Sequence, residues 1–111
     1  MNDFESRLAA VTELASQTAE AMDSIRPPNA LTPIEQLQGK EREAVEGWLN
    51  DAQLLLRHAD FIGHASNAEL PTEQRERYLA HAEGGLMVLH ALVMEFKRTG
   101  KTLLERMPPQ A

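Results

Sequence analysis

Residues 86–96 read Leu-Met-Val-Leu-His-Ala-Leu-Val-Met-Glu-Phe, and this stretch decides the fold. Only His90 and Glu95 interrupt it with polar side chains. A helix that is apolar around most of its circumference must be covered from several sides. A run of about eleven residues is also too short to cross a bilayer, which needs roughly 20. The stretch therefore predicts the central helix of a helical bundle.

The helical pattern around this stretch extends from about residue 72 to residue 106. Its main seam repeats at steps of three and four residues, which is typical of coiled-coil-like packing. Within residues 79–96 the seam consists of Leu79, Ala82, Leu86, Leu89, Val93 and Phe96. Thr72 is the expected cap, and Glu73 follows it where an acid suits the positive end of the helix dipole.

The first helix is predicted over residues 3–25. One face carries apolar or small side chains at helical spacing, namely Phe4, Leu8, Val11, Ala15, Thr18, Met22 and Ile25. Pro27 and Pro28 end this helix, because two consecutive prolines favour an extended connection. The stripe is thin, which indicates a helix that adds to a bundle without forming its centre.

A second helix is predicted over residues 33–65. Thr32 is a natural N-cap, Pro33 fits the first helical position, and Glu35 can reach back to the cap amide. Gly39 weakens the helix, so the segment forms either a short helix followed by a kink or one continuous rod. The expected core-facing stripe is broad. Its main pattern is Val45, Leu49, Ala52, Leu56, Ala59 and Gly63, flanked by Trp48, Leu55 and Ile62.

Residues 66–71 form a short turn, so the second and third helices are expected to pack as an antiparallel hairpin. Folding at this turn places Leu56 near Ala82 and brings His58 level with His81. The first helix can cover only one flank of the hairpin. The apolar residues around the third helix therefore predict a second chain, most simply another copy of this one and otherwise a different helical protein. The fold class is accordingly an all-α, single-domain three-helix bundle over residues 1–111 that dimerises through its third helix.

The predicted interface lies on this third helix. Its expected members are Gly85, Leu86, Met87, Leu89, Leu92, Val93, Met94 and Phe96. Gly85 beside the seam favours close approach of another backbone, since glycine costs roughly 1 kcal/mol in a helix.

The four histidines, at positions 58, 64, 81 and 90, invite a metal hypothesis. No two of them have the i, i+3 or i, i+4 spacing of a helical ligand pair, so we expect no metal and no cofactor. His90 interrupts the most apolar run. It is expected to make a buried hydrogen bond or to point to a cleft or interface, where a pH-sensitive contact is the sharper alternative. A cleft lined by Trp48, His58, His81 and His90 is therefore the alternative functional site.

Composition narrows the function classes. The formal net charge is −6, and the chain has no cysteine. The acidic balance argues against a nucleic-acid partner, whose phosphates call for a basic surface. The one basic cluster, Lys97, Arg98, Lys101 and Arg106, suits the carbonyl end of a helix. No signal-peptide pattern or membrane span is present, so a cytoplasmic location is expected.

The sequence contains no arrangement of catalytic residues that indicates an enzyme. The leading hypothesis is a small helical interaction protein: an adaptor, a chaperone-like factor or a regulator. The alternative is a helical bundle that binds a small ligand or metal in the histidine-containing cleft.

Overall fold

The structure is a computed structural model that describes residues 3–99 of the chain. It contains three helices, α1 (Asp3–Ser24), α2 (Gly39–Ala65) and α3 (Thr72–Thr99), together with one turn of 3-10 helix, η1 (Ile34–Gln36). No strand occurs in residues 3–99. The prediction of an all-helical bundle is confirmed. The predicted extension of the third helix to residue 106 lies outside the described residues.

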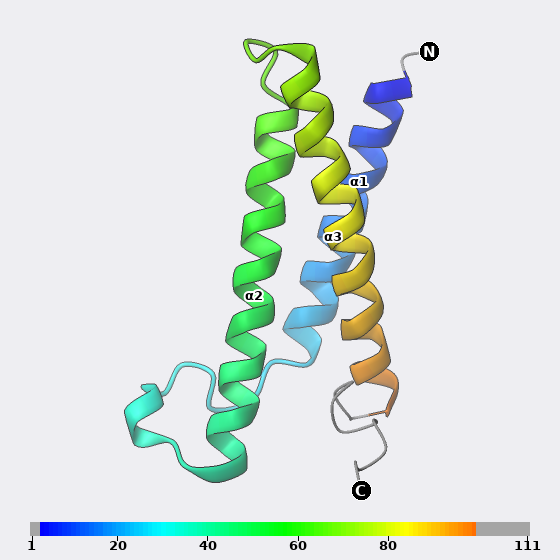
Figure 1. Cartoon of the computed structure of the whole chain (residues 1–111). Helices are drawn as coiled ribbons and strands as arrows, with labels where there is room; N and C mark the ends of the chain where they lie inside the picture. Colours follow the sequence, from blue (N-terminus) through cyan, green and yellow to red (C-terminus); the bar gives the residue numbers. More distant parts are fainter. Residues whose placement is uncertain (1–2, 100–111) are drawn as a thin grey trace, which may run out of the picture.

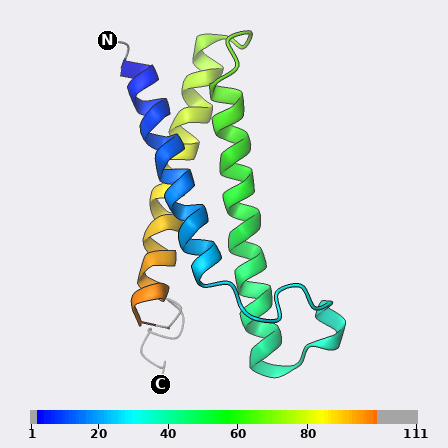
Figure 2. The same ribbon diagram turned by 180° about the vertical axis from the view of Figure 1, so that it is seen from behind.

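The long helices α2 and α3 lie side by side, and α3 runs back along α2 from the turn at residues 66–71 (Figure 1). Seen from behind, α1 lies against both of them and completes the bundle (Figure 2). The connection from α1 to α2 loops out at the end opposite the turn (Figure 2). Each helix therefore packs on the other two.

The interior consists of two clusters stacked along the bundle. The first core cluster, near the turn, contains Val11, Ala65, Leu79, Ala82 and Leu86. The second core cluster, nearer the opposite end, contains Ala21, Met22, Leu89 and Val93. Both α1 and α3 contribute to the two clusters, and α3 supplies five of their nine residues, more than either other helix.

The predicted faces of α1 and α3 are correct. On α1, Val11, Thr18 and Met22 are buried. The other members of the predicted α1 stripe, Phe4, Leu8, Ala15 and Ile25, pack against the two core clusters. On α3 the seam from Leu79 to Val93 is buried, and Phe96 is half-buried.

The predicted core face of α2 is wrong in part. Val45 is buried and Ala52 packs in the second core cluster, but Leu56 is 66% exposed and Ala59 and Gly63 face solvent. The flanking members of the expected broad stripe, Trp48, Leu55 and Ile62, do face the core. The helix is rotated toward this flank because its inner face must meet both α1 and α3. The expected contact between Leu56 and Ala82 therefore does not form.

The start of α2 also differs from the prediction. Pro33 precedes the single 3-10 turn, and no side-chain cap is formed there, so the expected Thr32 capping box is absent. Leu37 then turns extended and buries its side chain, and Gly39 takes a φ of +61° as α2 begins. Residues other than glycine rarely adopt that backbone conformation. Of the two alternatives, the short helix followed by a break is the one observed.

An ion-pair network joins α1 to α3. Arg7 makes two hydrogen bonds to Glu83, of 3.1 and 2.6 Å, and a further ion pair to Glu76. Glu76 and Glu83 are two helical turns apart on α3, and Arg7 lies between them. The hydrogen bonds from Arg7 hold the pKa of Glu83 below its ordinary value. Next to this network, Arg75 donates to the carbonyl of Ala65 at 2.9 Å.

This network predicts a specific acid sensitivity. A lowered Glu83 pKa stabilises the fold above the unfolded value of about 4.3, and this stabilisation is lost as pH falls through the folded pKa. Arg7→Gln should therefore lower the free energy of unfolding at pH 7 and have a smaller effect at pH 3. Urea denaturation at both pH values measures this difference. Arg42→Gln is the control, because Arg42 pairs only with Glu46 on its own helix in the described structure. An Arg7→Gln effect that is equal at the two pH values would contradict the account.

Candidate interaction surface and the histidine cluster

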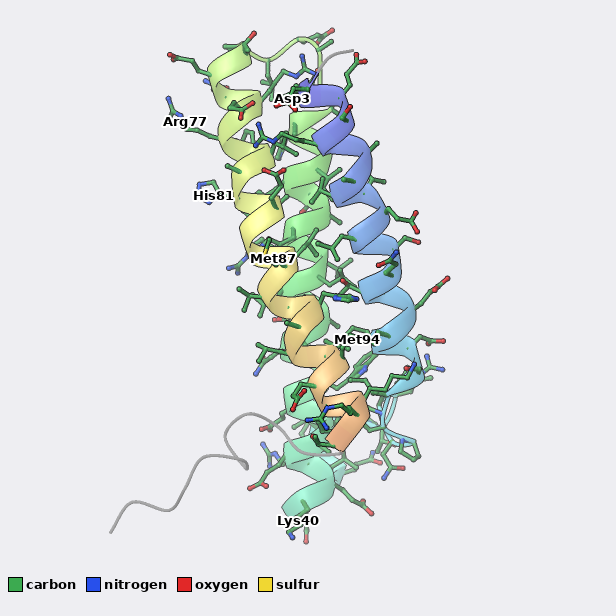
Figure 3. All side chains as sticks on the ribbon, turned by 90° about the vertical axis from the view of Figure 1, so that its right-hand side faces the viewer. Asp3, Lys40, Arg77, His81, Met87 and Met94 are labelled. Atoms are coloured by element: carbon green, nitrogen blue, oxygen red, sulfur yellow. The ribbon has the colours of Figure 1, made fainter. Side chains whose placement is uncertain are left out.

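One side of α3 is covered by neither α1 nor α2. We call it the outer face and define it by the exposed residues between Glu73 and Arg98 that point away from the core seam. Its large apolar members are Met87 (65% exposed), Val88 (60%) and Leu92 (40%), and Met94 (41%) lies at the edge of this face next to α1 (Figure 3). Figure 3 shows Met87 on this uncovered side, with Arg77 and His81 nearer the turn. Apolar side chains at positions 87, 88 and 92, next to the exposed Ala91, form a contiguous patch at helical spacing.

The predicted interface residues divide into two groups. Leu86, Leu89 and Val93 are buried inside the chain's own core, so a partner cannot reach them. Met87, Leu92 and Met94 remain exposed. Only this second group, joined by Val88, can contact another molecule. Their contact with a partner stays a prediction.

Rings from α2 and α3 gather beside the first core cluster. Phe61 lies at the centre, with ring centroids 5.6 Å from His58, 5.9 Å from Tyr78 and 5.9 Å from His81. His64 lies 4.7 Å from Tyr78. His58 and His81 thus both contact Phe61. The sequence contains a signal for this cluster that the predictions from apolar periodicity and metal-ligand spacing do not use: His58, Phe61 and His64 place a ring at every third position of α2.

His58 packs directly on Gly85. A Cβ built on Gly85 would overlap the imidazole at Nε2, whereas Gly63 and Gly84 have nothing within 4 Å of the corresponding position. The ring is fixed from its other side, since Nδ1 donates to the carbonyl oxygen of Leu54 at 2.7 Å. Gly85 therefore does permit a close approach, but by a side chain and not by another backbone. It also places His58 about one helical turn beyond the predicted position opposite His81.

This packing predicts opposite results for two glycines. Gly63→Ala should raise the free energy of unfolding by about 0.5–1 kcal/mol, because alanine is the better helix former and has room. Gly85→Ala should lower it, since the imidazole must leave its position. In a His58→Ala background, Gly85→Ala should instead be stabilising, with a coupling of about 1–2 kcal/mol in the double-mutant cycle. Urea denaturation of the four proteins gives the coupling. Additive effects would show that His58 does not rest on Gly85.

The structure does not bring Trp48 to the histidine cluster. Trp48 packs in the second core cluster, and its Nε1 donates to the carbonyl of Met22 at 2.8 Å. His90 is half-buried on α3, and its role as a pH-sensitive contact stays a prediction. Among residues 3–99, no three His, Asp or Glu side chains gather as a metal site would require. The cleft expected from Trp48, His58, His81 and His90 is therefore not assembled.

Other surface features offer less. Two shallow, open hollows are lined by Asn50, Gln53, Leu54 and Arg57, and by Phe4, Glu5, Thr72, Arg75 and Glu76. Asp51 on α2 is half-buried, and burial raises its pKa. In the basic cluster, Arg98 pairs with Glu95 at 2.6 Å, while Lys101 and Arg106 lie outside the described residues.

Of the seven large apolar side chains that are exposed among the described residues, four lie on α3. Within residues 3–99, no helix combines the length and apolar character that a membrane crossing requires. No family model, curated protein or solved structure matches the chain.

Proposed function

We propose that this protein is a small helical protein–protein interaction module, acting as an adaptor, a chaperone-like factor or a regulator without catalytic activity of its own. The outer face of α3 is its binding surface. The proposal rests on one observation: Met87, Val88, Leu92 and Met94 stay exposed on the same helix whose seam residues are almost completely buried.

Energetics support this assignment. Burying one more large apolar side chain stabilises a structure by roughly 1.5–3 kcal/mol. Single exposed apolar residues are common and need no explanation, as for Leu31 in the loop before η1. A contiguous exposed apolar patch on one helix face does call for an explanation, because such patches on a single protein chain often mark protein–protein interaction sites.

The shape of the surface favours a protein over a small molecule. Small ligands bind in concave pockets that bury most of their surface. The outer face is the convex side of a straight helix, and the two hollows on the described surface lie elsewhere. A convex helical stripe is complementary to another helix, or to the groove between two helices. The partner is therefore a helical protein, either a second copy of this chain or a different one.

A photo-crosslinking amino acid placed at position 87 tests this proposal in the cells that produce the protein. The matched control carries the same amino acid in place of Gln17, which is exposed on α1. We expect illumination to yield a discrete protein adduct from position 87 and much less from position 17. The identity of the adduct, by mass spectrometry, distinguishes a second copy from another protein.

Equal labelling at the two positions would contradict the proposal. So would an adduct at position 87 that consists only of nonspecific, abundant proteins also captured at position 17. Both modified proteins should keep the wild-type circular dichroism spectrum, because each changed side chain is exposed.

A further inference from the structure

We infer that the partner of the outer face is a second copy of this chain whose α3 runs in the opposite direction. This inference rests on the proposed function and specifies its partner. It starts from a second periodic stripe on α3, on the side away from the core. The outer seam consists of Glu73, Arg77, Ala80, Gly84, Met87, Ala91, Glu95 and Arg98.

The outer seam has the geometry of a helix–helix contact. Its steps are three or four residues throughout, the same spacing as the buried seam from Leu79 to Val93. Every member is exposed except Glu95, which is half-buried. Three of its central members, Ala80, Gly84 and Ala91, are small, and a side chain added at Gly84 would meet nothing within 4 Å. A second helix could therefore approach closely along this line.

When two copies of the outer seam are placed side by side in opposite directions, their residues fit each other in size. If two copies are related by a two-fold axis between Gly84 and Met87, each Met87 faces the Gly84 position of the other copy. Ala80 then faces Ala91. A large side chain therefore meets a small one at the centre, which lets the two helices approach closely.

The charges at the two ends favour the same orientation. Both ends carry an acid followed by a base, Glu73 and Arg77 near the turn and Glu95 and Arg98 near the other end. In an antiparallel pair, Glu73 faces Arg98 of the second copy, and Arg77 lies beside Glu95. In a parallel pair, each charged residue would face the identical residue of the second copy, so like charges would meet. Opposite charges across an interface fix the orientation, and like charges disfavour the alternative.

Disulfide formation tests this orientation, because the chain has no cysteine of its own. Ala80→Cys and Ala91→Cys change exposed residues of the full chain. In the antiparallel pair these two positions are opposite each other, whereas position 80 is about 16 Å from its own counterpart at 1.5 Å per residue. A disulfide requires Cα atoms within about 7 Å. We expect an equimolar mixture of the two variants to cross-link at least tenfold faster than either variant alone.

A charge-reversal series provides an independent measurement of the same geometry. Arg98→Glu should weaken self-association at least threefold in sedimentation velocity, because the new carboxylate at position 98 would face the carboxylate of Glu73 in the second copy. Adding Glu73→Arg should restore the affinity. Lys97→Glu, with the same charge change off the outer seam, should have a smaller effect.

Several outcomes would overturn the inference. Faster cross-linking of Ala80→Cys alone would indicate a parallel pair. Cross-linking of the mixture no faster than that of a Gln17→Cys control would show that this face does not bind a second copy. A specific adduct of another protein at position 87, together with slow disulfide formation, would overturn the inference and leave the proposed function standing. Failure of both experiments would overturn both.

Discussion

Leu86→Ala is expected to lower the free energy of unfolding by about 3 kcal/mol, whereas Met87→Ala should change it by less than about 0.5 kcal/mol. The two residues are neighbours on α3. Leu86 is completely buried in the first core cluster, so its truncation removes apolar contacts and leaves a cavity among three helices. Met87 is 65% exposed and loses little within one chain.

Urea denaturation at low micromolar concentration measures both changes while limiting any contribution from association. Equal losses for the two variants would mean that α3 is rotated about its axis relative to the structure. A loss at Met87 that grows with protein concentration would instead reflect a partner on the outer face, as proposed.

Leu55→Ala and Leu56→Ala should differ in the same way on α2. Leu55 packs against both core clusters, and its truncation is expected to cost about 2 kcal/mol. Leu56 is 66% exposed, and its truncation should cost about 0.5 kcal/mol or less. Because the substitution is chemically identical at adjacent positions, helix propensity cancels from the comparison.

The thermal midpoints of the two variants give the result directly. For a domain of about 100 residues, a difference of 1 kcal/mol corresponds to roughly 4–8 °C. A larger loss from Leu56→Ala would restore the α2 face expected from the sequence and contradict the observed one.

The contrast between α2 and α3 shows where sequence reasoning succeeds. On α3 the seam from Leu79 to Val93 has apolar residues at each three- or four-residue step, and the structure buries it as predicted. On α2, Leu54, Leu55 and Leu56 are consecutive, and Trp48 is followed by Leu49. Two overlapping stripes then fit the same helical period. Only the positions of α1 and α3 decide between them, and periodicity carries no information about those positions.

The register between α2 and α3 illustrates a second limit. Turn length fixes which helices are neighbours, but it leaves their relative sliding open by about one turn. In the structure the His58 ring rests on Gly85, which is possible at only one relative position of the two helices. The sequence indicates a close approach at Gly85 but does not indicate which residue approaches it. Part of the Arg7 network can be predicted from the sequence. Glu76 and Glu83 are seven residues apart, so they must share one face of a helix. An arginine on α1 completes the network, and its position depends on the packed bundle.

The candidate surface was predicted only in part. Met87, Leu92 and Met94 are predicted because one chain is too small to cover the circumference of α3, and they are exposed in the structure. Leu86, Leu89 and Val93 were assigned to the same surface and belong to the interior. The three- and four-residue spacing already places Leu86, Leu89 and Val93 in the core seam, and a seam that is buried within the chain cannot also contact a partner.

Methionine oxidation footprinting tests the central claim, that a partner covers the outer face of α3, most directly. Met22 is 3% exposed, Met87 65% and Met94 41%. In the purified, dilute protein, hydrogen peroxide should oxidise Met87 fastest and Met22 slowest, as peptide mass spectrometry would record. At high protein concentration, or in extracts of the cells that produce the protein, we expect oxidation of Met87 to slow at least several-fold, with little change at Met22. An oxidation rate at Met87 that is the same in dilute, concentrated and cellular samples would contradict the claim.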